Sequence, residues 1–433
     1  MSFLHKQSYE CTKSELDLFE VPPTQISFEN ARIVDYFPIA NIDNGPIEFF
    51  ISGSSDEYID LSQTFLYIEG MITLHEKDVA ANAKVNDVPV NYFLHSIFSQ
   101  VDVSLNETSI SSSVNSYPYR CIFETLLNYG SDAKNSHLAA SMFYKDTASK
   151  MVALDNTNDG GFKRLSLTKS EEPFSMYGRL HVDMFFQDRL LINNVNVRLK
   201  LNRSKDAFCL ISNCKSSKVK ITQAMLTVRK VKVNPKIMLA HAAVLEKSTI
   251  KYPVKRVELK SFTINSGLRA KTLDNVSLGP LPKKVVFGFV NSNAFNGDYT
   301  LNPFNFEHFH LTKVSVSIDG EDAPYSPVIM DFDKNLFSKA YYTLFNGLDR
   351  AGLDSGNEIS PNDFKGGYCI FAFDLTPDMC TGDHFNLVKS GNLRIGVTFG
   401  ADLATNVNCI VYMEHENIIE INKSRNIICD FKL

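Results

Sequence analysis

Two histidines, His308 and His310, have the residue types and spacing that most clearly suggest chemistry. Side chains at positions i and i+2 point to the same face of a strand, so the two imidazoles could donate nitrogens to one metal ion. His308 has a counterpart, His95, in a second, similar stretch of the chain, whereas Ile97 stands at the place that matches His310. A histidine that recurs beside a recurring phenylalanine favours a scaffold role over metal binding.

Three further groups contain potential ligands or acids. Glu414-His415-Glu416 lies between two strand-like segments, which predicts a polar hairpin tip. Asp331 and Asp333 could act as paired carboxylates, but they stand where a helix is expected to begin, and acids there stabilise the positive end of the helix dipole. Cys209 and Cys214 have no second pair that would complete a zinc site.

The chain carries none of the common local signatures of a catalytic centre. It contains no G-x-S-x-G elbow, no G-x-x-x-x-G-K-[ST] phosphate loop and no H-E-x-x-H helix. We therefore expect a protein that is not an enzyme, with no catalytic residues, no cofactor and no bound metal.

The elements that would position such residues occur twice in the chain. Residues 93–106 match residues 306–319 without a gap, at an offset of 213 (306 − 93). Residues 125–128 match residues 343–346, at an offset of 218 (343 − 125). Each half thus carries a strand, a loop and a helix in the same order. A period this long indicates a duplicated domain, because solenoid repeats recur every ~20–50 residues.

The patterning of the 433 residues predicts an all-β fold. Hydrophobic residues make up 44% and charged residues 21%, as in an ordinary globular chain, and 32 Phe and 17 Tyr suit half-buried pleated surfaces. Many short alternating segments separated by turns, with few helices, predict two tandem β-sandwiches or barrels with helices in the loops between strands. The expected parts are an N-terminal arm (1–25), a first sandwich (26–215) and a second sandwich (216–433).

Helices are expected at a few places only, and they lie in long loops. The expected helical ranges are 117–128, 136–144, 234–246 and 333–345, and a loop is expected at 156–161. Long loops that contain helices more often project from the surface and contact partners than form a layer of the core.

Charge is distributed unevenly along the chain. The net charge is −5, but residues 215–260 contain twelve Lys or Arg and two acids, which makes this segment +10 and the remainder −15. Two interpretations stay open: a solvated strand face with a linker, or a surface that faces something anionic, such as a neighbouring subunit or a genome. We expect the segment to lie at the junction of the two sandwiches and partly toward the base of the molecule.

Cysteine spacing and terminal patterning bear on the compartment. The eight cysteines are irregularly spaced, which favours free thiols in a reducing compartment. The first residues contain no apolar run typical of a signal peptide, and no segment approaches the ~18 apolar residues of a membrane span. We expect synthesis inside the host cell, no secretion through a signal peptide and no membrane span.

Over nearly its whole length the chain resembles double jelly-roll major capsid proteins, and within them the capsid protein of Polinton (Maverick) elements and related capsid-like proteins in animal genomes. The resemblance rests on the order of several segments together with the duplication, not on a chemical signature. These segments are Leu16–Gln25, Tyr117–Gly130, Asn234–Pro253, Pro280–Pro282 and Asn302–Gly320.

The resemblance implies a structural protein of a virion. It also implies that the two sandwiches, 26–215 and 216–433, are tandem jelly rolls (a double jelly roll). Three chains would form a homotrimer with six jelly rolls, a pseudo-hexagonal unit that self-assembles into an icosahedral shell. The arm would lie on the inner face. The implied partners are neighbouring capsomers, penton and minor capsid proteins, and an enclosed DNA genome that is contacted without sequence specificity.

Other classes remain open on the sequence alone. One is a non-enzymatic β-sandwich binding module, such as a lectin-like protein. A second is an enzyme whose site is built from loops without a local motif. A third is a host-domesticated capsid-like protein, whose sequence could look the same. Size in solution separates the capsid interpretation from a monomeric binding module.

Overall fold

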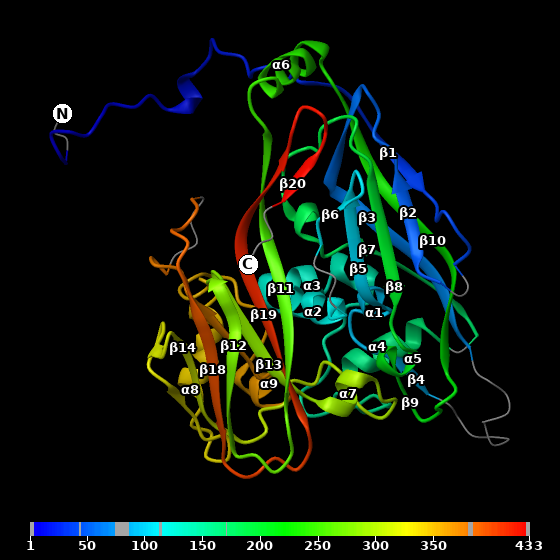
Figure 1. Cartoon of the computed structure of the whole chain (residues 1–433), viewed down its shortest axis with the longest axis vertical. Helices are drawn as coiled ribbons and strands as arrows, with labels where there is room; N and C mark the ends of the chain where they lie inside the picture. Colours follow the sequence, from blue (N-terminus) through cyan, green and yellow to red (C-terminus); the bar gives the residue numbers. More distant parts are fainter. Residues whose placement is uncertain are drawn as a thin grey trace.

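The structure is a computed structural model that describes residues 4–42, 45–73, 86–111, 115–169, 171–379 and 384–429; Cys380 lies outside these ranges. Two β-rich units stand side by side, and an extended N-terminal arm leaves the body at one end (Figure 1). Long loops carrying short helices fill the space between the units (Figure 1).

The first unit consists of two four-stranded antiparallel sheets. In spatial order, one sheet contains β1 (Phe28–Tyr36), β10 (Lys218–Val233), β3 (Glu57–Thr73) and β7 (Pro173–Arg179). The other contains β2 (Ile47–Ile51), β8 (Val197–Arg203), β5 (Phe98–Leu105) and β6 (Thr108–Ser109). A small ribbon of β4 (Asp87–Pro89) and β9 (Leu210–Ser212) lies beside them.

The second unit repeats this arrangement. One sheet contains β11 (Ile250–Ile264), β19 (Val407–Ile421), β13 (Lys284–Asn291) and β17 (Ile370–Asp374), with β20 (Ile427–Cys429) paired to β19. The other contains β12 (Ala270–Pro280), β18 (Ser390–Phe399), β14 (Leu311–Ile318) and β15 (Glu321–Asp322), with β16 (Val328–Ile329) paired to β14.

The two units share one strand topology, which is that of a jelly roll. We number the eight main strands of each unit along the chain and leave out the short strands β4, β9, β16 and β20. With this numbering, both units have sheets ordered 1-8-3-6 and 2-7-4-5. The fourth strands, β5 and β14, begin at residues 98 and 311, which is the offset of 213 seen in the sequence. Helices α2 (Tyr117–Asn128) and α8 (Ser338–Asn346) end 218 residues apart, again as the repeat predicts. The double jelly roll with helices in its loops is confirmed.

The expected boundary between residues 215 and 216 disagrees with the strand pairing. Strand β10, which was expected to open the second jelly roll, lies between β1 and β3 and closes the first. The second jelly roll begins with β11, and helix α6 (Pro235–Leu245) connects the two units. Alternating apolar residues predict a strand but not its partner, so the local pattern alone could not place β10.

Each core is built from alternate residues of paired strands, because successive side chains point to opposite faces of a sheet. In β5 the buried residues include Val101, Val103 and Leu105, and their partners on β8 are the buried Leu201, Leu199 and Val197. The same relation joins Val314 and Val316 of β14 to Val397 and Ile395 of β18.

In the part of the chain that the structure describes, each α-helix lies in a connection between strands, and one 3-10 turn lies in the N-terminal arm. Besides α2, α6 and α8 the helices are α1 (Phe93–Ser96), α3 (Ser131–Lys134), α4 (Asp159–Leu167), α5 (Asp206–Cys209), α7 (Ser292–Asn296) and α9 (Pro361–Lys365), with 3-10 turns at Ser14–Leu16, His137–Ser141 and Asp183–Phe186. The prediction of α2 is confirmed. The expected loop at 156–161 is wrong, because α4 starts within it: Asn158 caps the helix by accepting from the Gly161 amide.

Helix α6 forms as the sequence predicts. The Asn234 side chain accepts a hydrogen bond from the Lys236 amide at 3.0 Å, and Pro235 occupies the first helical turn, where a missing N–H is harmless. The helix lies at one end of the molecule, beside the point where the arm departs (Figure 1).

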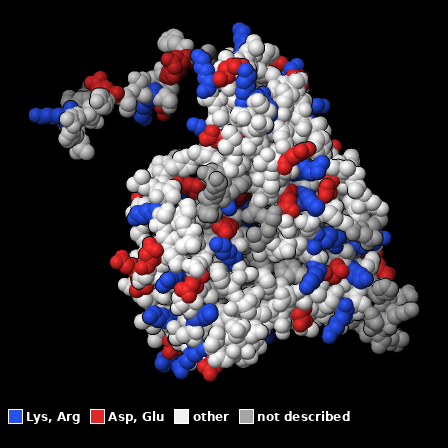
Figure 2. All heavy atoms as spheres, viewed as in Figure 1, with Lys and Arg blue, Asp and Glu red and all other residues white. Residues whose placement is uncertain are grey.

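The basic segment 215–260 therefore spans the connection between the two units. Several of its cations are paired inside the chain, for example Arg229 with Asp60 at 2.7 Å and Lys260 with Glu258 at 3.3 Å. On the face in Figure 2, blue and red side chains are interspersed among neutral ones. This distribution favours the solvated-face interpretation for much of the segment.

Candidate functional site

The two histidines with the greatest potential for chemistry do not share a strand face. His308 and His310 precede β14 in a turn, and His310 has a positive φ of 52°. The His308 ring stacks on Phe332 with 4.1 Å between ring centroids, and His310 Nδ1 lies 3.2 Å from a carboxylate oxygen of Asp333. His308 is thus held by aromatic packing, as expected for a scaffold residue.

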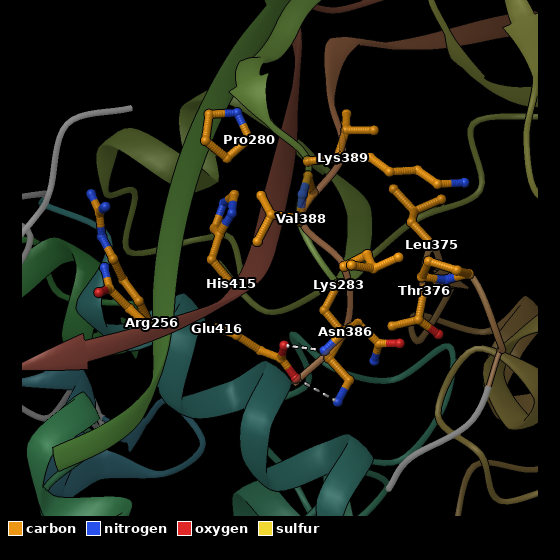
Figure 3. A pocket seen from close by; sticks show the side chains of 15 residues that line it. Arg256, Pro280, Lys283, Leu375, Thr376, Asn386, Val388, Lys389, His415 and Glu416 are labelled. Atoms are coloured by element: carbon orange, nitrogen blue, oxygen red, sulfur yellow. Dashed lines mark hydrogen bonds and ion pairs between the residues drawn. The ribbon is translucent and has the colours of Figure 1, made fainter. Parts of the chain in front are cut away.

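Glu414-His415-Glu416 is not a hairpin tip, and that prediction was wrong. The three residues lie inside β19, a continuous 15-residue strand between β11 and β13. His415 and Glu416 line a pocket of about 280 Å³ (Figure 3). There Glu416 lies 3.2 Å from Lys283 Nζ and accepts from the Asn386 amide at 3.0 Å. Among the described lining residues Glu416 has no second carboxylate with which to form an acid–base pair.

The remaining candidate residues also have structural roles. Asp331 and Asp333 do not begin a helix, because α8 starts at Ser338. Instead, an Asp331 oxygen accepts from the Asp333 and Lys334 amides at 3.1 and 3.0 Å and closes a turn. Cys209 and Cys214 are buried free thiols, like the other cysteines in the interior of the described chain.

Within the described ranges no group of three or more His, Cys, Asp or Glu side chains is placed to hold a metal ion. In the same part of the chain no helix has both the length and the apolar character needed to cross a membrane.

The most elaborate polar chemistry of the molecule lies between the two jelly rolls. Helix α2, from the first unit, is buried along almost its whole length. Phe123 on this helix stacks on Phe306 of the second unit with 5.1 Å between centroids, and meets Tyr412 of β19 edge-on at 6.3 Å. The helix is therefore a wedge packed between the units.

A buried ionic cluster lies on the same helix. Arg120 contacts Glu124 at 2.9 Å and Asp183 at 2.7 Å, and Glu124 also lies 2.5 Å from His181 Nδ1. Burial alone would raise the pKa of Glu124, but the Arg120 charge and the His181 contact outweigh it and lower the pKa to about 2. The Tyr412 hydroxyl donates to Glu124 at 3.4 Å, which ties the cluster to the second unit.

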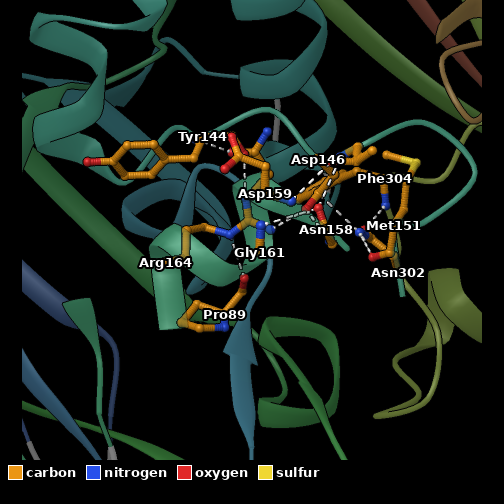
Figure 4. A network of polar contacts seen from close by, with 12 residues as sticks. Pro89, Tyr144, Asp146, Met151, Asn158, Asp159, Gly161, Arg164, Asn302 and Phe304 are labelled. Atoms are coloured by element: carbon orange, nitrogen blue, oxygen red, sulfur yellow. Dashed lines mark hydrogen bonds and ion pairs between the residues drawn. The ribbon is translucent and has the colours of Figure 1, made fainter. Parts of the chain in front are cut away.

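A second buried network joins the units through loops (Figure 4). The side chains of Asp146 and Arg164 are fully buried, and Arg164 Nη2 lies 2.5 Å from Asp146 Oδ1. Asn158 donates to the same carboxylate at 2.9 Å, and Asn302 of the second unit donates to it at 3.2 Å. Arg164 Nε also donates to the Pro89 carbonyl at 2.7 Å, so the network connects β4, helix α4 and the loops that carry Asp146 and Asn302.

Further contacts across the junction lie nearer the surface. Lys145 pairs with Asp363 at 2.8 Å, and the guanidinium of Arg425 donates to Asn193 Oδ1 at 2.8 Å. These contacts, with α2 and the two buried clusters, hold the two jelly rolls in one relative orientation. The arrangement therefore fixes the shape of the double jelly roll.

Sequence reasoning missed both clusters. Asn302 lies 156 positions from Asp146 in the chain, and Asp146, Asn158 and Arg164 match no motif. One local signal was present, the Gly160-Gly161 pair, which fell within the loop expected at 156–161. A Cβ at Gly160 would collide with the Lys145 carbonyl oxygen, so the glycine marks the close approach of two backbones beside the network.

Three buried or partly buried histidines predict a loss of stability in mild acid. Burial lowers the pKa of His95 well below 6.5 and, with the His310 charge, lowers that of His308 to about 4; burial likewise lowers the pKa of His415 to about 4. The unfolded chain takes up these protons near pH 6.5, whereas the folded chain takes them up only at lower pH, near pH 4 for His308 and His415. The free energy of unfolding should therefore fall across this window, by up to about 1.4 kcal/mol per pH unit for each histidine.

Urea unfolding at pH 7 and pH 5 measures this effect. His95→Gln should make the pH dependence shallower, and the same replacement at the exposed His5 serves as the control. Glu124 affects the free energy of unfolding in a different pH range. Its lowered pKa adds stability that is lost only below about pH 4.5. Equal slopes for the wild type and His95→Gln would contradict the prediction.

Comparison with known proteins identifies the fold. No protein-family model matches the chain. An uncharacterized protein of Caenorhabditis elegans is 27% identical over 429 residues, which cover 95% of this chain and 99% of that protein. A chain of the Sputnik virophage structure has a TM-score of 0.61 at 12% identity, over 100% of this chain and 95% of that chain.

Two solved major capsid proteins are similar over comparable lengths. The Faustovirus protein has a TM-score of 0.56 at 10% identity, over 93% of this chain and 92% of that chain. The mavirus protein has a TM-score of 0.54 at 12% identity, over 100% and 96%. The chain thus has the fold of double jelly-roll major capsid proteins, as the resemblance in the sequence implied.

Proposed function

We propose that the chain is a major capsid protein. Three copies form a homotrimer whose six jelly rolls make a pseudo-hexagonal unit, and these units tile an icosahedral shell that encloses a DNA genome. A ring of three identical chains uses one heterologous contact three times and closes on itself. The role is structural and not enzymatic.

One observation carries the proposal: a single jelly-roll topology occurs twice in the chain, and buried contacts such as Asn302 with Asp146 and Phe306 with Phe123 lock the two copies side by side. Because each chain holds two similar sandwiches in a fixed orientation, a trimer presents six similar sandwiches and can occupy a lattice position that has six neighbouring units. The similarity to two proteins described as major capsid proteins, over nearly their whole lengths, supports the same conclusion.

The position of the arm suggests which side of the molecule faces the inside of the shell. The arm and α6 lie at one end of the molecule, which we assign to the inner base of the shell (Figure 1). Neighbouring capsomers, penton proteins and minor capsid proteins would contact the sides and base. Contacts with enclosed DNA would be independent of base sequence, because they would be made to the phosphates, which carry no sequence information. Localisation in the virion, after synthesis inside the host cell without a signal peptide, belongs to the same proposal.

Mass in solution tests the trimer. The purified full-length chain, at 48.7 kDa, should give a species of about 146 kDa (3 × 48.7 kDa) by light scattering, with larger assemblies as concentration rises. A lectin-like binding module would instead stay monomeric at every concentration. A persistent 48.7 kDa species would therefore count against the capsid proposal and for that alternative.

A host-domesticated capsid-like protein is the second candidate. The observation that favours it is the Caenorhabditis elegans relative, which matches over 99% of its length and belongs to a cellular organism. Such a protein would keep the fold and the trimer. Purification from its native source distinguishes the two: nuclease-protected DNA inside particles supports the capsid proposal, and particles without DNA support the domesticated protein.

A further inference from the structure

The N-terminal arm presents large apolar side chains that its own copy does not cover. Within residues 15–21, Leu16, Leu18, Phe19 and Val21 are 67, 75, 96 and 86% exposed. Burying such side chains is the main favourable term in association, so this much exposure on one short segment indicates a surface that is covered by something else. The arm runs away from the body of its own chain (Figure 1).

A matching surface lies beneath α6. A groove of about 500 Å³ is formed there by the helix and by residues of both jelly rolls. Its lining is largely apolar, with Tyr58, Ile192, Ile237, Val244, Leu245 and Tyr252 among the contributing residues. Helix α6 itself has apolar side chains at all of its positions except Lys236 and His241, yet only Leu245 is buried and Leu239 is 71% exposed. A helix with this pattern is ordinarily covered on both sides.

The charges of the arm and the groove are complementary. Residues 15–21 carry three acids, Glu15, Asp17 and Glu20, and no cation. The described lining of the groove includes Arg189 and Lys251 and no carboxylate. Interspersed acids on the arm and cations at the groove would steer association and fix the orientation of a docked segment.

We propose that residues 15–21 of the arm dock in the α6 groove of a second copy of this chain. The proposal rests on the capsid function and names a contact that links its subunits. Leu16 is eleven residues before Ser27, where the arm meets the groove edge, so the arm reaches at most about 40 Å beyond its own body. Pro22 and Pro23 stiffen this stretch and oppose its folding back.

Cross-linking between two differently labelled full-length chains tests this exchange. Both chains carry Cys11→Ser, because Cys11 is an exposed thiol on the arm. One also carries Leu18→Cys and the other Val244→Cys, a position that lines the groove and is 62% exposed. After mixing and mild oxidation, a two-chain product of about 97 kDa (2 × 48.7 kDa) is expected.

Three further variants test the specificity of this product. Ile329→Cys, which is 73% exposed on β16 of the second unit, should replace Val244→Cys with at least about tenfold lower yield. Adding Phe19→Asp to the Leu18→Cys chain should lower the yield by about tenfold, the factor expected when one buried apolar side chain is lost. Tyr9→Asp, at an exposed arm position outside residues 15–21, should leave the yield unchanged.

The outcomes separate this proposal from the capsid function. Trimers that form without the specific cross-link would overturn the arm exchange and leave the capsid function standing. Closure within a single chain that carries both Leu18→Cys and Val244→Cys, at high dilution, would also overturn it, because the arm would then dock on its own copy. The specific cross-link in a chain that forms no trimer would support the exchange and count against the capsid function.

Discussion

Asp146→Ala is expected to lower the free energy of unfolding by about 3–5 kcal/mol. The Asp146 and Arg164 side chains are fully buried and form an ion pair at 2.5 Å. Removal of the carboxylate leaves the Arg164 guanidinium uncompensated in the interior and deprives Asn302 of an acceptor. The loss should appear in chemical denaturation at fixed protein concentration, since any assembly also adds apparent stability.

An exposed ion pair on α4, the helix that carries Arg164, supplies the control. Lys163 and Asp159 lie 2.8 Å apart, but their side chains are 53 and 70% exposed. Lys163→Ala should therefore change the free energy of unfolding by no more than about 0.5 kcal/mol. If Lys163→Ala and Asp146→Ala lowered the free energy of unfolding equally, the buried network around Asp146 would not be what stabilises the junction.

Phe123→Ala is expected to be comparably damaging, at about 3–5 kcal/mol. Phe123 is 1% exposed and lies between the two jelly rolls, where it stacks on Phe306 and contacts Tyr412. Truncation leaves a cavity at the junction that the flanking sheets cannot close. Because the relative orientation of the units depends on this contact, the variant should also form fewer trimers at a given concentration.

Thermal unfolding and light scattering on the same samples measure both effects. Phe162→Ala is the matched control, since Phe162 lies on α4 with 48% of its side chain exposed. It should retain the melting temperature and the trimer yield. A Phe123→Ala chain with normal stability and normal trimers would show that α2 does not act as a wedge.

The duplication and much of the fold could be predicted because they are written in local patterns. The match between residues 93–106 and 306–319 places β5 and β14 at equivalent positions, and the apolar spacing of 117–128 predicts α2 with its observed bounds. Strand pairing is not a local property. For that reason β10 was assigned to the wrong jelly roll, although its alternation was recognised.

The junction could not be predicted, for physical reasons that differ from residue to residue. Helix α4 starts with Asp159-Gly160-Gly161, and two glycines oppose a helix by intrinsic propensity; capping by Asn158 and packing override that preference. Glu414-His415-Glu416 resembles a hairpin tip, but it lies inside β19, where Lys283 neutralises Glu416. Contacts such as Asn302 with Asp146 join residues 156 positions apart and leave no trace in sequence spacing.

Electron microscopy of the full-length chain at assembly concentration tests the central claim most directly. We expect particles, or flat patches of shell, whose units have a pseudo-hexagonal outline and resolve into six jelly rolls from three chains. Fields that contain only isolated monomers, each with two jelly rolls and no repeated contact, would contradict the account.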